Sequence, residues 1–186
     1  MKTFFRLSIF LIVAAALVTV AQHQHQQHSQ SSNAAQQMNK VKTLTDVEVE
    51  NYLNGRGMGL AKPAELNSYP GPMHVLQLAE PLGLSPQQKQ VTQQAFERMR
   101  AEAVRLGESI IAKESEIDRL FASGKVEAQG LAKLTHETAI MQGELRLTHL
   151  RAHLEMKRVL SPAQISKYDE LRGYKTAQNV RHGNEN

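Results

Sequence analysis

The feature that most restricts the fold is a pair of long segments in which apolar residues recur with helical spacing. Within residues 86–123, one apolar stripe recurs at intervals of seven and consists of Phe96, Ala103, Ile110 and Ile117. A neighbouring apolar stripe consists of Met99, Leu106 and Leu120, and Lys113 is the one charged residue that interrupts it. Residues 126–160 carry a similar stripe of Leu131, Leu134, Met141, Leu145 and Ala152. Such repetition is typical of helices that pack as in a coiled coil. The sequence therefore predicts two helices, each about 50–57 Å long at about 1.5 Å per residue.

The segments around these helices predict an all-α fold. Gly124 ends the first long helix, and the turn after it is so short that the second helix has to fold back antiparallel. Before the hairpin, residues 45–54 favour a helix, and the four prolines between 60 and 84 indicate short helical pieces joined by turns. After it, a last helix is expected to end near Gly173, with Ile165, Tyr168 and Leu171 facing inward. We expect a long antiparallel helical hairpin with shorter flanking helices.

A five-residue pattern occurs twice, as LSPQQ at 84–88 and as LSPAQ at 160–164. In each copy the serine suits the N-cap of a helix, where its side chain accepts a hydrogen bond from a backbone N–H of the first turn. Proline is tolerated next because that N–H has no helical partner, and glutamine three residues after serine completes a capping box. We predict that each copy starts a helix. The motif residues are Leu84, Ser85, Gln88, Leu160, Ser161 and Gln164.

The N-terminus has the pattern of a secretory signal peptide. A positively charged start, with Lys2 and Arg6, precedes an apolar run that ends at Ala21, and Thr19 and Ala21 supply the small residues of a cleavage site. An uncleaved membrane anchor is the alternative, although the run is shorter than the roughly 20 residues that a spanning helix needs. We predict cleavage of residues 1–21 and export to the periplasm.

The remaining terminal segments are polar. Residues 22–44 are rich in Gln, His, Ser and Asn and are predicted to be disordered, because they hold too little apolar surface to offset the entropy of ordering. Three histidines in this segment (His23, His25 and His28) are able to chelate a metal, but a solvated polar spacer is the favoured interpretation. The helical domain is expected over 45–174, and 175–186 form a polar C-terminal tail.

Composition and charge exclude several functional classes. The chain has no cysteine, which excludes disulfides, thiolate metal sites and a lipid anchor on an N-terminal cysteine. Without residues 1–21 there are 20 Lys and Arg against 18 Asp and Glu, so no basic patch indicates nucleic-acid binding. No phosphate loop or Ser/His/Asp arrangement is present. The acidic residues alternate with arginines along the predicted helices, which is typical of a solvated surface. We therefore expect that the chain is not an enzyme.

A second apolar stripe on the later helix predicts self-association. Leu147, Leu150 and Leu154 lie away from the stripe that faces the other long helix. A two-helix hairpin leaves this surface uncovered, and the shorter helices are able to cover only a part of it. We therefore expect a homodimer.

Two histidines near the end of the second long helix are candidate metal ligands. His149 and His153 are four residues apart, so they lie about 40° from each other around the helix, and Met156 falls within the same arc. Imidazole and thioether groups suit Zn, Cu or Ni. The alternative is that both histidines lie on a polar, solvated flank between Arg151 and Lys157.

Two Leu-Ser-x-x-Gln motifs around a long helical hairpin, after a signal peptide, resemble the Spy/CpxP family of periplasmic proteins, which also includes zinc-responsive and nickel/cobalt-sensing members. The similarity covers about residues 69–174, with HVLQLAEPLGLSPQQ at 74–88 and LSPAQISKYDELRGY at 160–174 as its firmest parts. The resemblance implies a four-helix hooked hairpin and a cradle-like dimer. It adds His74 to the candidate metal ligands, because metal-sensing members use histidines on an earlier helix.

The resemblance implies two functions. The first is an ATP-independent chaperone of the envelope stress response, which binds unfolded or misfolded envelope proteins and requires no cofactor. The second is a heavy-metal sensor or resistance protein that binds Zn, Ni or Cu. Either one implies a membrane sensor protein as a further partner. In the sequence, the absence of a nucleotide motif fits the first function, and the His149/His153 pair fits the second.

Overall fold

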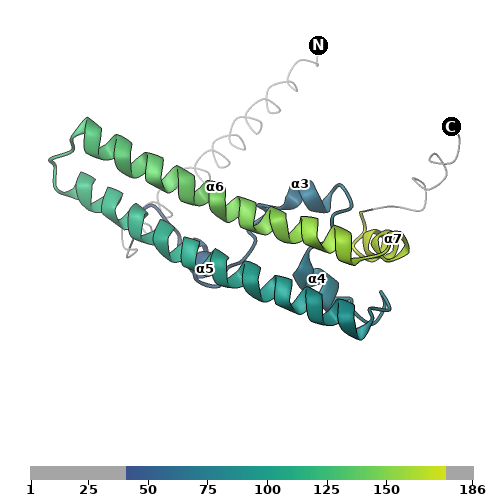
Figure 1. Cartoon of the computed structure of the whole chain (residues 1–186). Coiled ribbons are helices and arrows are strands. Elements are labelled where there is room, and N and C mark those ends of the chain that lie inside the picture. The colour runs from purple at the N-terminus through teal and green to yellow at the C-terminus, as the bar shows by residue number, and fades with distance from the viewer. Residues whose placement is uncertain (1–40, 175–186) are drawn as a thin grey trace, which may run out of the picture. The chain divides into compact units, whose positions relative to one another are not determined.

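The computed structural model describes residues 41–174 (Figure 1). The predicted signal peptide, the His-rich tract at 22–40 and the tail at 175–186 lie outside the described residues. The chain divides into two compact units, Met1–Thr45 and Asp46–Asn186, and the description below concerns the second. Throughout the described part of the chain, the regular elements are helices and no strand occurs, which confirms the all-α class. None of the helices between residues 41 and 174 has both the length and the hydropathy needed to cross a membrane.

Two long helices dominate the second unit. They are α5 (Pro86–Ala122) and α6 (Ala128–Val159), and residues 123–127 join them. The two helices lie side by side and run in opposite directions (Figure 1). Three short helices precede them, α2 (Asp46–Leu53), α3 (Lys62–Glu65) and α4 (Pro72–Gln77), and α7 (Pro162–Leu171) follows. Prolines occupy the first turns of α3, α4, α5 and α7, where their missing N–H costs no helical hydrogen bond.

The core consists of two separate apolar clusters along the pair of long helices. The first joins α4, α5, α6 and α7 and contains Val75, Leu82, Leu84, Ala95, Met156, Leu160, Ile165 and Tyr168. The second lies further along α5 and α6 and contains Ala103, Leu106, Ile110 and Leu145. The predicted stripes supply most of the second cluster, whereas Phe96 and Met99 lie between the two clusters and are only partly buried.

Leu171 was expected to face inward from the last helix, and this expectation is wrong because the residue is 43% exposed. At about 100° per residue, Leu171 lies about 120° around the helix from Ile165. Asp169 lies only about 40° from Ile165, and it is fully buried. Its Oδ2 accepts a hydrogen bond from Ser68 Oγ at 2.6 Å, so a paired carboxylate takes the inward position.

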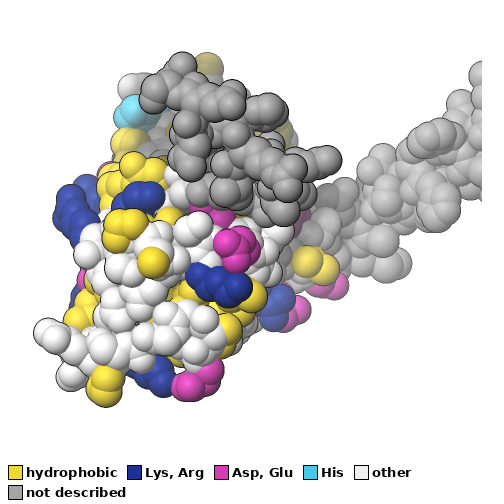
Figure 2. All heavy atoms as spheres, turned by 90° about the vertical axis from the view of Figure 1, so that its right-hand side faces the viewer, with side chains coloured by type: hydrophobic (Ala, Val, Ile, Leu, Met, Phe, Trp, Pro, Cys, Tyr) yellow, Lys and Arg dark blue, Asp and Glu magenta, His cyan; other side chains and the backbone are white. Residues whose placement is uncertain are grey.

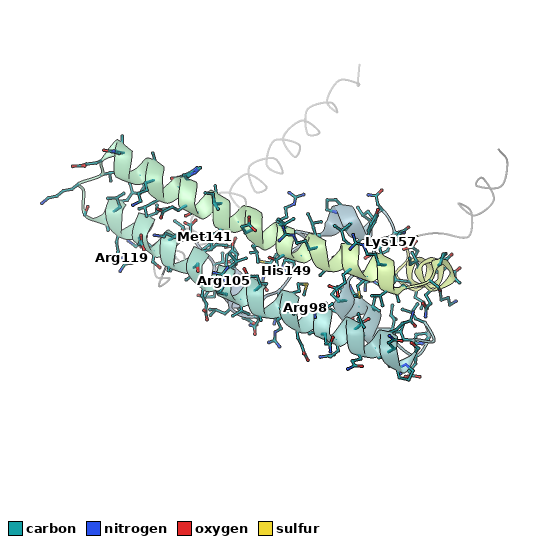
Figure 3. All side chains as sticks on the ribbon, viewed as in Figure 1. Arg98, Arg105, Arg119, Met141, His149 and Lys157 are labelled. Carbon is teal, nitrogen blue, oxygen red and sulfur yellow. The ribbon has the colours of Figure 1, made fainter. Side chains whose placement is uncertain are left out.

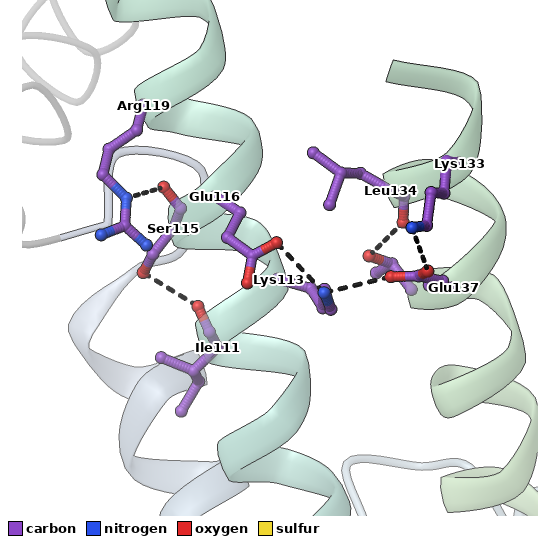
Figure 4. Close-up of polar contacts among 9 residues, drawn as sticks. Ile111, Lys113, Ser115, Glu116, Arg119, Lys133, Leu134 and Glu137 are labelled. Carbon is purple, nitrogen blue, oxygen red and sulfur yellow. Dashed lines mark hydrogen bonds and ion pairs between the residues drawn. The ribbon is translucent and has the colours of Figure 1, made fainter. Parts of the chain in front are cut away.

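The one charged residue in the α5 stripe is accommodated by ion pairs (Figure 4). Lys113 Nζ lies 3.0 Å from Glu116 Oε2 on the same helix and 3.0 Å from Glu137 Oε2 on α6. The hydrogen bond from Lys113 lowers the pKa of Glu137 below its ordinary value. Lys113 therefore links the two long helices beyond the end of the second cluster.

Helix α2 packs closely on α5 at a glycine. A Cβ atom added to Gly107 would lie 2.6 Å from the backbone oxygen of Tyr52 and 2.9 Å from its carbonyl carbon. Both are backbone atoms, so only a residue without a side chain allows this approach. Gly107 is buried, and the α2–α5 contact therefore depends on it.

Candidate functional site

Both copies of the repeated motif begin a helix, as predicted. Ser85 is the N-cap of α5 and Ser161 is the N-cap of α7, and each has a complete capping box. Gln88 N donates to Ser85 Oγ at 3.1 Å, and Ser85 N donates to Gln88 Oε1 at 3.0 Å. The corresponding distances in the second copy are 3.2 and 2.9 Å.

The two motifs also contact each other, which the local pattern did not predict. Gln88 Nε2 donates to Gln164 Oε1 at 2.9 Å, and Gln164 Nε2 donates to Gln88 Oε1 at 3.1 Å. Each amide has a second acceptor on the chain that precedes the other motif. Gln88 Nε2 donates to Val159 O at 3.0 Å, and Gln164 Nε2 to Leu82 O at 3.3 Å. Each glutamine thus caps its own helix and joins the other, so the starts of α5 and α7 are held together.

Alanine at either cap tests this arrangement. Ser161→Ala is expected to lower the free energy of unfolding by about 0.5–2 kcal/mol, and Ser85→Ala by a similar amount, because each removes an acceptor for an N–H of the first helical turn. Ser166→Ala is the matched control, since Ser166 is exposed within α7 and alanine favours helix there. Urea unfolding followed by circular dichroism measures all three. Equal stability of the cap variants and the control would contradict the role of the motif.

A loop between α3 and α4 is fastened to α6 and α7 by polar contacts. Lys157 Nζ donates to Ser68 O at 2.8 Å, and the ammonium group lies 4.9 Å from the centre of the Tyr69 ring. Gly71 N donates to the hydroxyl of Tyr168 at 3.3 Å. Burial raises the pKa of Tyr168 to about 12, so its hydroxyl stays protonated at neutral pH. These contacts fix the backbone of residues 68–71 beside α6.

This loop orients His153. The Nδ1 atom of His153 lies 2.8 Å from Tyr69 O. A carbonyl oxygen only accepts hydrogen bonds, so Nδ1 carries the hydrogen and, in the neutral ring, Nε2 keeps its lone pair. A Cβ atom on Gly71 would lie 2.8 Å from Cε1 and 3.1 Å from Nε2 of the same ring. Glycine at position 71 therefore makes the room that the imidazole occupies.

His149, which is labelled in Figure 3, lies on α6 one helical turn before His153, and both residues are buried. It is only 3% exposed, and its Nε2 has no hydrogen-bond partner among the described residues. Burial lowers the pKa of His149, and the neighbouring His153 lowers it further. The ring is therefore neutral at pH 7, which is the form that binds metal ions.

His74 approaches the same region from α4. Its Nδ1 lies 3.3 Å from Glu65 Oε1, and Glu65 Oε2 accepts a hydrogen bond from the Tyr174 hydroxyl at 3.2 Å. Burial and the positive charge of Arg172 lower the pKa of His74, and the opposing effect of Glu65 is smaller. A carboxylate beside one ring nitrogen orients a histidine and leaves the other nitrogen available to a ligand.

The three histidines line one pocket of about 630 Å³. The pocket lies between the two apolar clusters, because its α5 residues fall between Ala95 and Ala103 and its α6 residues between Leu145 and Met156. The glycine-rich segment 55–59 and the start of α4 contribute further walls. Besides the histidines, the lining includes Met58, Glu65, Met73, Phe96, Met99 and Arg100.

The structure therefore brings together His74, His149 and His153 but places Met156 elsewhere. Met156 is fully buried in the first cluster and does not line the pocket. The alternative of a solvated polar flank does not hold for His149 and His153, which are 3% and 6% exposed. Across residues 41–174, no group of three or more His, Asp or Glu side chains is arranged to hold a metal ion. In the described structure, the three histidines are therefore not arranged to bind one ion together.

The residues that shape this pocket could not be recognised from the sequence pattern. Glu65, Tyr69 and Gly71 position the imidazoles, and three methionines supply the neighbouring surface. Pro70, one of the four prolines between 60 and 84, indicated only a turn at this point. The signal available in the sequence was a methionine directly before His74 and another within the glycine-rich segment, although the spacing alone does not show that they meet.

Comparison with family models, curated proteins and solved structures finds no match to this chain.

Proposed function

We propose that this protein is an ATP-independent chaperone of the cell envelope, of the kind that the Spy/CpxP resemblance implies, and that it binds unfolded client proteins. The observation that supports this proposal is an uncovered apolar stripe on α6. Ile140 is 52% exposed and Leu154 is 47% exposed, and the partly buried Leu147 lies midway between them at intervals of seven residues. These three side chains lie within an arc of about 40° on the helix.

Two further large apolar residues are exposed near the junction of the long helices, Phe121 at the end of α5 and Val126 in the turn before α6. Phe121 is 56% exposed and Val126 is 37% exposed. Large apolar side chains at this level of exposure attract apolar segments of an unfolded chain without requiring a defined sequence. Such a surface suits a protein that binds many clients weakly.

Charged residues are interspersed with the apolar ones. Arg98 on α5 pairs with Glu155 on α6 at 2.8 Å, next to the exposed Leu154. Figure 2 shows the same mixture on the end of the molecule that carries α7, where hydrophobic side chains adjoin Lys, Arg, Asp and Glu. Charges beside apolar groups keep such a surface hydrated and limit its affinity, so bound clients are released.

The finer features of the fold belong to the same proposal. The hooked shape, the cradle-like form of the dimer and the membrane sensor partner follow from the resemblance, whereas the homodimer itself was expected from the second apolar stripe and the periplasmic location from the signal-peptide pattern. The uncovered stripe is compatible with a dimer, because a second copy of the chain would also bury Ile140 and Leu154. Dimer formation and client binding are therefore tested on the same variant.

The test is an aggregation assay with a variant in which glutamates replace two exposed apolar residues of the stripe. The double variant Ile140→Glu/Leu154→Glu is expected to lose most of the ability to slow light scattering by reduced α-lactalbumin and by heat-unfolded malate dehydrogenase, without ATP and at near-stoichiometric ratios. Carboxylates on the stripe remove the apolar attraction. The matched control is Thr135→Glu/Gln142→Glu, which adds the same charge at two exposed positions on another side of α6.

Sedimentation velocity of the same proteins distinguishes client binding by the stripe from contact between two copies of the chain. A variant that keeps the oligomeric state of the parent but loses the activity identifies the stripe as a client surface. A change from dimer to monomer that occurs only in the stripe variant identifies it as the contact between copies. Unchanged activity of the stripe variant on both clients, or no activity of the parent chain, contradicts the proposal.

A second candidate function is metal binding, as a sensor or resistance protein for Zn, Ni or Cu. The observation that favours it is the meeting of His74, His149 and His153 in one pocket, with an unpartnered Nε2 on the buried His149. Titration with Zn²⁺, Ni²⁺ and Cu²⁺ tests it. The variant His149→Ala/His153→Ala is expected to weaken metal binding and to keep the chaperone activity. Loss of the chaperone activity in that variant, or a strict requirement for metal, would make metal binding the primary function.

A further inference from the structure

We propose that the pocket between α4, α5 and α6 binds a soft monovalent ion, Cu(I), through methionine sulfur together with imidazole nitrogen. This inference deepens the second candidate function and rests on it, since it requires that the histidine pocket binds metal. It differs from the sequence-based expectation in two respects. Met156 takes no part, and the ion is monovalent and soft.

The sulfur content of the pocket points to this ion. Three of the seven methionines of the chain, Met58, Met73 and Met99, line the pocket, and they come from three different parts of the chain. Met73 directly precedes His74 in α4, and Met99 extends from α5. The chain has no cysteine, so thioethers are the only sulfur ligands that it is able to offer. Thioethers select Cu(I) over the harder divalent ions.

The contacts of the two histidines on α6 fit nitrogen ligation. The contact of His153 Nδ1 with Tyr69 O leaves Nε2 as the ligating atom. His149 is buried with an unpartnered Nε2. A metal-ligating histidine usually donates the N–H of one ring nitrogen to a backbone carbonyl or a carboxylate and binds the ion through the other nitrogen. His153 has this arrangement, with Nδ1 bonded to Tyr69 O.

The charge of the pocket lining favours a monovalent ion over a divalent one. Within residues 41–174 no three His, Asp or Glu side chains are arranged to share an ion, so in this proposal the thioethers that line the pocket complete the site. The pocket also has three cationic side chains, Arg56, Lys62 and Arg100, and one carboxylate, Glu65. Repulsion from these cations is half as large for a monovalent ion as for a divalent one.

The experiment compares Cu(I), Ag⁺ and Zn²⁺ on the purified chain. All proteins carry His23→Asn, His25→Asn and His28→Asn, so that the His-rich tract does not compete. Cu(I) affinity is measured without oxygen by competition with bathocuproine disulfonate, and Ag⁺ serves as a redox-inert substitute in calorimetry. The test variant is Met58→Leu/Met73→Leu/Met99→Leu, which keeps side-chain volume. The control is Met141→Leu, since Met141 packs against the second cluster and does not line the pocket.

The parent and the Met141→Leu control are expected to bind one Cu(I) or one Ag⁺. The triple methionine variant is expected to bind both ions at least about tenfold more weakly, with Zn²⁺ affinity unchanged. Equal Cu(I) affinity of the triple variant and the parent would overturn this proposal. If Zn²⁺ binding nevertheless depends on His149 and His153, the second candidate function stands although the Cu(I) proposal fails. If the parent binds none of the three ions, the Cu(I) proposal and the second candidate function both fail. Thermal unfolding of every variant establishes that a loss of binding is not a loss of folding.

Discussion

Replacing Met156 with alanine is expected to lower the free energy of unfolding by about 2–5 kcal/mol. Met156 is completely buried at the meeting point of α4, α5, α6 and α7, in the first apolar cluster. Removing its side chain leaves a cavity that several helices would have to close together. Urea unfolding measures the effect. The matched control is Leu154→Ala on the same helix, where the side chain is 47% exposed and a change within about 0.5 kcal/mol is typical of a surface position.

The Met156→Ala variant also tests whether Met156 is a metal ligand. Because Met156 does not line the pocket, Met156→Ala is expected to retain the Ag⁺ affinity of the parent under conditions where both are folded. Equal stability of Met156→Ala and Leu154→Ala would contradict the burial of this residue. A loss of Ag⁺ binding in a folded Met156→Ala protein would return Met156 to the group of metal ligands that its spacing from His149 and His153 suggested.

Adding a single methyl group at Gly107 is the second large effect that we expect. Gly107→Ala should lower the free energy of unfolding by about 1–3 kcal/mol, because the new Cβ would overlap the backbone of Tyr52 and α2 would have to move away from α5. The burial of Tyr52 should fall at the same time. Burial is the main reason why the pKa of this tyrosine is raised, so its pKa should move back toward the ordinary value, which ultraviolet titration measures.

Gly143→Ala is the matched control for Gly107→Ala. Gly143 is in the middle of α6, and an added Cβ there meets no atom within 4 Å. Alanine is a better helix former than glycine, so Gly143→Ala should raise stability by roughly 0.5–1 kcal/mol. The two identical substitutions are thus expected to have opposite signs. A gain in stability at both positions would show that α2 does not pack on α5 as described.

The helices could be predicted from the sequence because their signals are local. The capping boxes at Ser85 and Ser161 involve atoms only three residues apart, so the motif itself contains both partners. The observed bounds of the two long helices lie within about two residues of the predicted ones, which is the usual uncertainty of a helix end. The apolar stripes were predictable for the same reason, since residues seven apart share a face of a helix.

The pocket could be predicted only in part. The spacing of His149 and His153 placed them together on α6, but it also placed Met156 beside them. The structure separates these residues because α7 and α4 cover the end of α6 and draw Met156 into the first cluster. The contribution of His74 came only from the resemblance. The contacts of His153 with Tyr69 and Gly71 depend on a loop more than 80 residues away in the sequence.

The sequence by itself determined the helical class, the ends of α5 and α7 and the division of α5 and α6 by a short turn, because these depend on caps, glycine and apolar spacing within one segment. Only the tertiary structure decided that Gln88 and Gln164 join their two motifs across 76 residues. It also decided that the histidines and methionines line one pocket while Met156 is buried in the core. The physical reason is that a capping hydrogen bond forms within one helical turn, whereas a pocket forms where separate helices meet, and their packing depends on the side chains of all of them together.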